Sequence, residues 1–326
     1  MTEDLSQPDS APIPDRLVRV LLPIAAPGVE LAQVRTRSLD AHSNDVAEVR
    51  VPDGRVLMVK RGRYPWSAAR LRASRAAAEL LSPTGALVPD PLPLPEGVDA
   101  RPVEAYWRIP NPTLLELWPR LSPTLRRRAL RSLGALLRRV HSVPAPRHGP
   151  LGDSEAAAPS MAAFLRADLG ERLLPAVYGV WPEAAGMVER LVDAVGAVAA
   201  RMDGAPPVLL HGDVHLGNVL CEERGGGVRA VGLLDLEGAA GGPAESDLAI
   251  AQVHHGEFFN APLPDGWFGF LRRGYRRVPD PVVLRFYRGV HLANMGFHSA
   301  LVGHDVHATS VAGALAQEVQ GLPAGA

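Results

Sequence analysis

Residues Val208 to Ala249 read VLLHGDVHLGNVLCEERGGGVRAVGLLDLEGAAGGPAESDLA, and they place many polar side chains between short apolar runs. The opening VLL predicts a short strand, which HGDVHLGN cannot continue, so we expect a turn that presents its side chains. Two further apolar runs on either side of GGG predict a β-hairpin. That hairpin would return Asp235 to the side of Asp213 and Asn218.

Two carboxylates and an amide oxygen that converge in this way are hard ligands, which suit Mg²⁺ and phosphate oxygens better than zinc. Phosphoryl transfer needs a carboxylate that receives the proton of an acceptor hydroxyl, and ligands for the metal. The spacing of Asp213, Asn218 and Asp235 supplies both. A metal hydrolase using His211, Asp213 and His215 is a chemical alternative, disfavoured because the paired-histidine spacing of common zinc hydrolases is absent. A buried polar hairpin in an unrelated fold is the structural alternative.

The two halves HGDVHLGNVL and LLDLEGAAGGPAESDLA resemble the catalytic loop and the metal-binding segment of the aminoglycoside phosphotransferase family, which are relatives of protein kinases. The resemblance implies a two-lobed, protein-kinase-like α+β fold, with a small antiparallel β-sheet N-lobe and a mainly helical C-lobe. It implies that Asp213 is the catalytic base and that Asn218 and Asp235 bind Mg²⁺. His211 would be a structural member of the catalytic loop, and Asp247 would brace that loop.

The composition restricts the class of protein. The chain has 326 residues, 47% hydrophobic and 21% charged, so it can bury a core and form two lobes. A formal net charge of −1 gives no reason to expect nucleic acid. The N-terminal residues lack the pattern of a signal peptide, and no apolar run is long enough to span a membrane. The chain has one cysteine, Cys221, which fits a reducing compartment, so we expect a cytoplasmic enzyme. We also expect a monomer or a homodimer that binds neither nucleic acid nor membrane.

One lysine stands out among the basic residues. The chain has 34 basic side chains, and Lys60 is the single lysine among them. Arginine replaces lysine where a solvated positive charge is enough, but not where a compact ammonium is needed. The runs 34–39, 46–51 and 56–60 predict a small antiparallel sheet that ends at Lys60, as expected for the nucleotide-binding lobe of a kinase. Chance retention of one surface lysine is the alternative.

The segments on either side of this lysine supply two more candidates. DAHSN, residues 40–44, resembles the phosphate-covering loop of the family through its Ser-Asn pair, although the usual glycines are absent. Ser43 would then meet phosphate oxygens; the alternative is that it caps a turn. Glu79 is the one acid in the helix predicted over residues 67–81, and in kinases such a glutamate orients the strand lysine. An exposed pair with Arg75 is the alternative for Glu79.

A strand predicted from residue 103 to Ile109 is followed by the break Pro110-Asn-Pro112, where a kinase hinge would lie. Backbone groups near Tyr106, Trp107 and Ile109 should therefore receive the adenine edge, whereas stacking by the two aromatic rings is the alternative. The expected organisation is a disordered tail over residues 1–15, a nucleotide-binding N-lobe over 16–109 and a helical C-lobe with the catalytic loop and acceptor site over 110–326.

The C-lobe should hold the acceptor. Residues 1–149 carry 22 basic and 15 acidic side chains (+7), and residues 150–326 carry 12 and 20 (−8), which together give −1. A negative lobe would attract a cationic acceptor; an ordinary solvated acidic surface is the alternative. The candidate acceptor-binding residues are Glu237, which could otherwise reach a second metal, and His254, Glu257, His291, Asn294 and His298.

We therefore predict an enzyme that moves the γ-phosphoryl group of ATP, or GTP, to a hydroxyl of a small molecule, with Mg²⁺ as cofactor. The resemblance favours an aminoglycoside-type antibiotic as acceptor, with resistance by O-phosphorylation, and a hygromycin-like aminocyclitol in particular. Kinases of sugars, amino alcohols and biosynthetic intermediates share the same motifs. A nucleotide-binding regulatory protein without turnover is the alternative of another class, and the glycine-poor loop is its only support.

Overall fold

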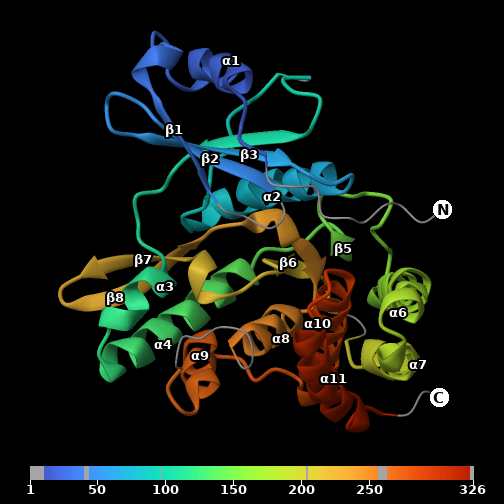
Figure 1. Ribbon diagram of the computed structural model, residues 1–326. Coiled ribbons are helices and arrows are strands. Elements are labelled where there is room, and N and C mark those ends of the chain that lie inside the picture. Colours follow the sequence, from blue (N-terminus) through green and yellow to red (C-terminus); the bar gives the residue numbers. More distant parts are fainter. Residues whose placement is uncertain (1–10, 40–43, 96, 203–204, 256–262, 324–326) are drawn as a thin grey trace.

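A four-stranded antiparallel sheet, in the order β1-β2-β3-β4, forms the centre of the smaller lobe (Figure 1). Its strands are β1 (Arg35–Leu39), β2 (Asn44–Arg50), β3 (Val56–Gly62) and β4 (Val103–Trp107). The computed structural model describes residues 11–39, 44–95, 97–202, 205–255 and 263–323.

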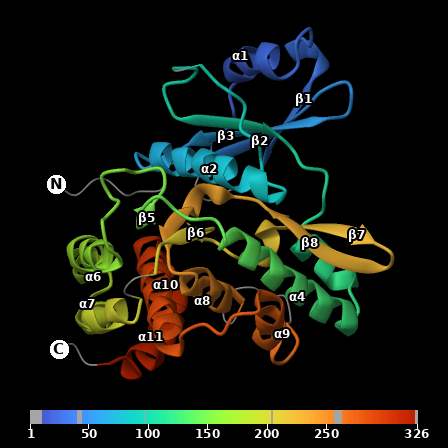
Figure 2. The same cartoon turned by 180° about the vertical axis from the view of Figure 1, so that it is seen from behind.

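The two faces of this sheet have different partners, because side chains alternate along a strand. Helix α1 (Asp15–Ala25) covers one face, where Leu57 and Val59 pack against its apolar side. Helix α2 (Ser67–Leu81) lies on the opposite side, toward the larger lobe (Figure 2). Lys60 follows Val59 in β3 and therefore points away from α1, toward α2 and the larger lobe.

Residues 11–15 pack against this lobe, which corrects the expected disordered tail for these five positions. Ile13 is buried, and the Ala11 N–H donates to Asp45 Oδ1 at 3.0 Å. The same carboxylate pairs with Arg63 and Arg101. The chain just before α1 is thereby fixed to β2 by partners from distant segments, which residues 11–15 alone do not reveal.

Most of the larger lobe is helical. Its longest early helix, α4 (Pro123–Val140), begins after Ser122, whose hydroxyl accepts the Leu125 N–H at 3.4 Å as a helix cap. The other helices are α3 (Leu114–Leu117), α5 (Met161–Leu165), the π-helical η4 (Arg166–Leu173), α6 (Leu174–Val180), α7 (Ala185–Ala200), α8 (Glu245–Val253), α9 (Trp267–Tyr275), α10 (Pro281–Leu301) and α11 (Asp305–Gln320).

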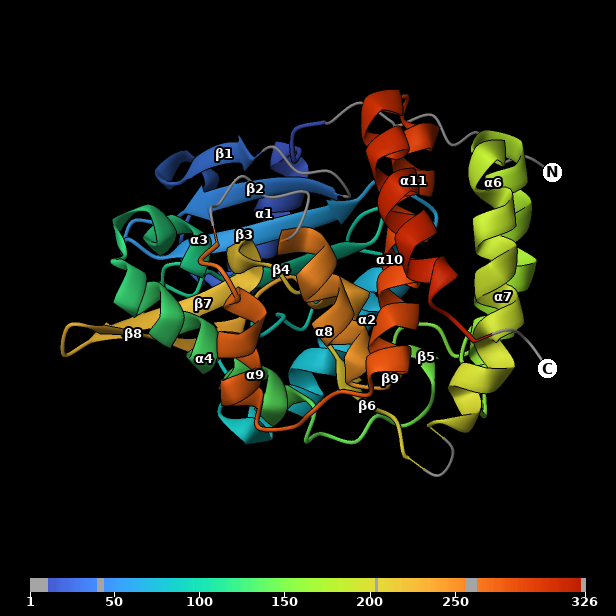
Figure 3. The ribbon, with the colours of Figure 1, turned by 90° about the horizontal axis from the view of Figure 1, so that it is seen from below.

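Two hydrophobic cores support this lobe, one around α4 and the other around α7, α10 and α11. The two groups of helices lie side by side when the molecule is seen from below (Figure 3). Helix α8 lies between them, since Leu248 packs in the first core and Ala249 in the second. Helix α8, which carries Asp247, is therefore packed against both cores. No helix in the described part of the chain combines the length and apolar character needed to cross a membrane.

Short strands run through the segment from Val208 to Ala249. A three-stranded antiparallel sheet has the order β5-β9-β6, and a separate hairpin pairs β7 with β8. Their bounds are β5 (Gly149–Pro150), β6 (Val208–Leu210), β7 (Val219–Arg224), β8 (Gly227–Leu233) and β9 (Ala240–Gly242). The predicted hairpin is thus present, and it returns the chain to the turn that follows β6.

The connection between the lobes is attached to both of them. The Arg108 N–H donates to Val56 O at 2.8 Å, and Asn111 Nδ2 donates to Cys221 O at 3.0 Å. β4 ends two residues earlier than predicted, before Pro110, which has no N–H to donate to a sheet. The predicted α+β architecture, a small antiparallel sheet followed by a mainly helical lobe, is confirmed.

Candidate active site

The turn that follows β6 in the larger lobe carries Asp213. Asn218 Nδ2 donates to the main-chain oxygen of Asp213 at 3.0 Å and to its Oδ2 at 3.1 Å. His254 Nε2, just after α8, lies 3.1 Å from Oδ1, and His215 Nε2 lies 3.6 Å from Oδ2. Burial raises the pKa of Asp213, but the contacts with the two histidines outweigh it and hold the pKa well below its usual range. The carboxylate is therefore ionised at neutral pH, as a general base must be.

A second carboxylate lies beneath this turn. Asp247, in the first turn of α8, is fully buried and accepts the N–H groups of His211 and Gly212, both at 2.8 Å. His141 Nε2 is 2.9 Å from Asp247 Oδ2, and its Nδ1 meets the Tyr275 hydroxyl at 2.8 Å. Burial raises the pKa of Asp247, but these hydrogen bonds lower it further than burial raises it. Asp247 thus ties the catalytic loop to α8 and to the end of α4.

The loop also needs a glycine at position 212. Gly212 has φ of 80°, and a Cβ there would lie 2.1 Å from the carbonyl oxygen of Gly238. A left-handed backbone alone costs an alanine about 1–2 kcal/mol. Because the Cβ would also clash with Gly238, Gly212→Ala should lower the melting temperature by more than this backbone cost explains. Gly226→Ala at the tip of the β7–β8 hairpin is the matched control, because φ is 70° and no atom lies within 4 Å of its Cβ. If Gly212→Ala and Gly226→Ala lower the melting temperature equally, the contact between residue 212 and Gly238 is not what requires a glycine.

Lys60 forms the centre of a second polar cluster. Its Nζ donates to Asp235 Oδ1 and Glu237 Oε1, both at 2.8 Å. Asn44 Nδ2 donates to both Glu237 oxygens, at 2.8 and 3.0 Å, and Arg70 Nε lies 3.5 Å from Glu237 Oε2. Burial lowers the pKa of Lys60, but the charge of Asp235 and its neighbours outweighs burial and raises the pKa well above its usual value. The lysine is therefore a buried cation.

The two clusters are close enough to influence each other. Burial and the charge of Asp213 raise the pKa of Asp235, while the charge and hydrogen bond of Lys60 lower it by more. The side chains of Asp213 and Asp235 are 32% and 42% exposed, so solvent reaches both carboxylates. The structure thus brings Asp213, Asn218, Asp235 and Lys60 into one polar site.

The oxygen atoms left at this site suit a hard cation. Among the described residues, neither Asp235 Oδ2 nor the amide oxygen of Asn218 takes part in a hydrogen bond. Mg²⁺ keeps several waters and takes one or two carboxylates together with phosphate oxygens, so a small set of protein oxygens fits it. In the described ranges, no group of three or more His, Cys, Asp or Glu side chains is placed to hold a metal by itself. The donor chemistry therefore fits magnesium shared with a nucleotide.

Glu79 is not where the sequence led us to expect it. It is exposed on α2, whereas Ser74 and Ala78 on the same helix are buried toward the lobe interior. The partners of Lys60 come instead from the segment that follows β8. This is a correction: the rotation of α2 about its axis, set by packing of its small residues, turns Glu79 away from Lys60.

The hinge residues divide between the two faces of the sheet. Tyr106 is buried on the side of Lys60, whose Nζ lies 6.0 Å from its ring centroid. Trp107 packs on the α1 side, with the guanidinium of Arg55 4.1 Å from its ring. The two rings therefore do not form one stacking surface, and the adenine-binding role of the backbone up to Ile109 stays a prediction. Ser43 lies outside the described residues.

The candidate acceptor residues are only partly brought together. His254 contacts Asp213, whereas Glu237 faces Lys60. On α10, His291 Nε2 lies 3.0 Å from the main-chain oxygen of Ser246, Asn294 Oδ1 accepts from Arg172 at 3.1 Å, and His298 is exposed. Glu257 lies outside the described residues. Arg70 is a site residue that the sequence did not indicate, and the contacts of His215 with Asp213 and of Asn44 with Glu237 were not predicted, because only the fold shows them.

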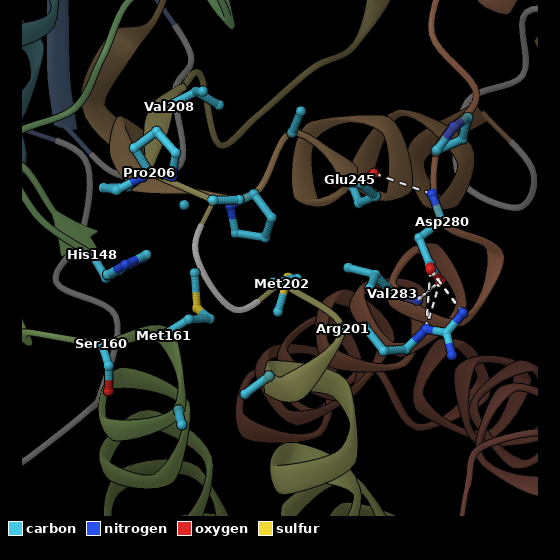
Figure 4. A pocket seen from close by; sticks show the side chains of 18 of the residues that line it. His148, Ser160, Met161, Arg201, Met202, Pro206, Val208, Glu245, Asp280 and Val283 are labelled. Atoms are coloured by element: carbon cyan, nitrogen blue, oxygen red, sulfur yellow. Dashed lines mark hydrogen bonds and ion pairs between the residues drawn. The ribbon is translucent and has the colours of Figure 1, made fainter.

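A separate cavity of about 630 Å³ is lined in part by Glu245, at the start of α8 (Figure 4). Met161, Arg201 and Glu245 are among its lining residues. Arg201 Nη2 pairs with Asp280 Oδ2 at 2.8 Å, and the Asp280 N–H donates to Glu245 Oε1 at 3.2 Å. Neither the catalytic turn nor the Lys60 cluster contributes to its lining, so this cavity is distinct from the polar site.

A sheet lobe with a buried lysine, joined to a helical lobe whose loop carries Asp213, Asn218 and then Asp235, defines a kinase-like phosphotransferase. The sequence profile described as the phosphotransferase enzyme family, APH, matches residues 36–287, and the chain belongs to this family. The family resemblance noted in the sequence is confirmed. The protein is accordingly a small-molecule O-phosphotransferase.

Solved structures of antibiotic phosphotransferases share the fold. The macrolide 2'-phosphotransferase MphH from Brachybacterium faecium is 21% identical over 91% of this chain and 97% of its own, with a TM-score of 0.57. A thermostable mutant of aminoglycoside phosphotransferase APH(4)-Ia, in complex with AMP-PNP and hygromycin B, is 16% identical over 93% of this chain and 97% of its own, with a TM-score of 0.69. Spectinomycin phosphotransferase APH(9)-Ia, in complex with ADP and spectinomycin, is 16% identical over 95% of this chain and 94% of its own, with a TM-score of 0.56. A comparison with curated protein sequences found no match.

Proposed function

We propose that this protein transfers the γ-phosphoryl group of ATP, or of GTP, to a hydroxyl of a cationic antibiotic of the aminoglycoside type. The observation that supports the reaction best is the position of Asp213. Its carboxylate is ionised, is held by Asn218 and His254, and is close enough to Asp235 for the two charges to interact. A base beside phosphate-binding and metal-binding side chains is what phosphoryl transfer requires.

Each residue would have a separate task. Asp213 would orient the acceptor hydroxyl and take its proton while the hydroxyl oxygen bonds to the γ-phosphorus. The bond from the γ-phosphorus to the β–γ bridging oxygen breaks, and the nucleoside diphosphate leaves with that electron pair. Lys60 would donate to the α- and β-phosphates, and Asp235 and Asn218 would hold Mg²⁺, which when bound neutralises phosphate charge. Positioning and charge neutralisation would supply most of the rate.

The acceptor class rests on charge and on the relatives. Residues 150–326 carry a formal charge of −8 (12 basic and 20 acidic), which favours a cationic acceptor over a neutral sugar. Two of the similar structures hold hygromycin B and spectinomycin, and we carry the antibiotic class, not either compound, to this chain. His254 lies beside Asp213 and would therefore contact the acceptor near its reacting hydroxyl.

The test is a screen for acceptor-dependent release of ADP or GDP with Mg·ATP and with Mg·GTP. The panel contains aminoglycosides, aminocyclitols, macrolides, sugars and amino alcohols, and each hit is checked by mass for the gain of one HPO₃ group. We expect turnover with amine-bearing antibiotics and none with neutral sugars. Turnover with sugars alone would contradict the acceptor class. Nucleotide binding without release for any acceptor would favour a regulatory nucleotide-binding protein.

A further inference from the structure

Strand β4 places a buried carboxylate directly opposite Lys60. In the antiparallel pairing of β3 with β4, the partner of Lys60 is Glu104, next to the pair Met58 and Tyr106. Residues opposed in this way point to the same face of a sheet, with Cβ atoms about 4.5–5.5 Å apart. Glu104 is 2% exposed, and neither of its carboxylate oxygens has a hydrogen-bond partner among the described residues.

The buried carboxylate of Glu104 lowers the stability of the folded protein. An unpaired buried carboxylate loses its hydration without compensation, so its presence calls for a partner in another state of the protein. Burial raises the pKa of Glu104 to about 7, although the charge of Lys60 and the nearby hydroxyl of Ser74 act to lower it. The group that would stabilise the ionised form most is therefore the ammonium of Lys60.

The other two carboxylates around Lys60 have competing tasks. Asp235 is the proposed ligand of Mg²⁺, and a carboxylate that serves a dication is a weaker partner for an ammonium. Glu237 is already shared by Asn44, Lys60 and Arg70. Of the described carboxylates that influence Lys60, Glu104 is the one that takes part in no ion pair, and Ser74 is its one polar neighbour on α2.

Helix α2 does not supply this carboxylate. The residue of α2 that lies beside Glu104 is Ser74, which is 3% exposed. Its side chain is short and uncharged, so it cannot form an ion pair with Lys60. Glu79, the one acid of the helix, is exposed, and the ion pairs of Lys60 are with Asp235 and Glu237 instead. The sheet therefore carries the acidic group that the helix lacks at this place.

We propose that Glu104 positions Lys60 for the nucleotide phosphates, in place of a glutamate on α2. This rests on the proposed role of Lys60 in nucleotide binding. When nucleotide binds, Lys60 turns from Asp235 toward Glu104, and its remaining N–H groups point at the phosphates. Glu104 is a positioning residue, because it acts through Lys60 and does not touch the nucleotide.

The test compares Mg·AMP-PNP affinity, by calorimetry, with the melting temperature of the nucleotide-free protein. Glu104→Gln keeps the shape of the side chain and removes its charge. We expect Mg·AMP-PNP to bind about 10-fold more weakly or worse, by analogy with the roughly 10–100-fold losses that follow removal of residues supporting metal ligands. The melting temperature should stay unchanged or rise, because a buried amide is less costly than a buried, unpaired carboxylate. A merely structural role predicts the reverse pattern.

Two further variants sharpen the comparison. Glu79→Gln is the matched control and should change neither quantity, because that side chain is exposed. Glu104→Gln combined with Ser74→Glu returns a carboxylate from the helix side and should recover part of the lost affinity. Wild-type affinity in Glu104→Gln would overturn the inference and leave the proposed function intact. Failure of the wild-type protein itself to bind the nucleotide would overturn both.

Discussion

Asp213→Asn is expected to lower kcat by about 10²–10⁴-fold, the usual contribution of a general base, while Mg·nucleotide affinity stays close to that of the wild type. The described contacts of the Asp213 side chain are with Asn218, His215 and His254, not with the Lys60 cluster. Asparagine keeps the shape of the side chain but cannot take a proton from the acceptor. Release of nucleoside diphosphate measures kcat, and calorimetry with AMP-PNP measures affinity.

A control carboxylate separates this effect from a general change of charge. Glu222 lies on the β7–β8 hairpin and pairs with Arg229 at 2.8 Å on the surface, so Glu222→Gln should leave kcat and affinity unchanged. Near-normal turnover in Asp213→Asn would remove Asp213 from the mechanism. A parallel loss of nucleotide affinity would instead place Asp213 among the groups that hold the metal and phosphates.

Local signals in the sequence were sufficient for much of the fold. The helix predicted over residues 67–81 has these bounds in the structure, because its run of alanine, leucine and arginine favours a helix at every position. The three early strands were located within two residues by their apolar runs. Asp213, Asn218 and Asp235 could be grouped from the sequence because they lie on one loop and one hairpin, close together in the chain.

The remainder depends on contacts between distant segments. The choice between Glu79 and Glu104 as a neighbour of Lys60 is decided by the β3–β4 register and by the rotation of α2, and neither is encoded in a short stretch. The contact of His254 with Asp213 likewise depends on where α8 ends relative to the turn after β6. Residues of the right type were visible in the sequence, but their partners were not.

The largest loss of stability is expected from Asp247→Ala. The substitution leaves the N–H groups of His211 and Gly212, and the ring of His141, without their buried partner. Each buried hydrogen-bonding group left without its partner typically costs about 1–3 kcal/mol, and three such groups are affected here. Because the loop that carries Asp213 loses its support, kcat should fall as well. Urea unfolding of wild type and variant at pH 7 measures the difference.

The pH dependence of that difference tests the cause. The pKa of Asp247 is lowered in the folded protein, so its contribution is complete above the carboxyl pKa of the unfolded chain and is lost as pH falls toward the folded pKa. The gap between wild type and Asp247→Ala should therefore narrow below about pH 4. Asp53→Ala, at the exposed turn between β2 and β3, is the control and should change stability by no more than about 0.5 kcal/mol. A gap that is the same at pH 7 and pH 3 would show that packing, not the carboxylate charge, holds the catalytic loop.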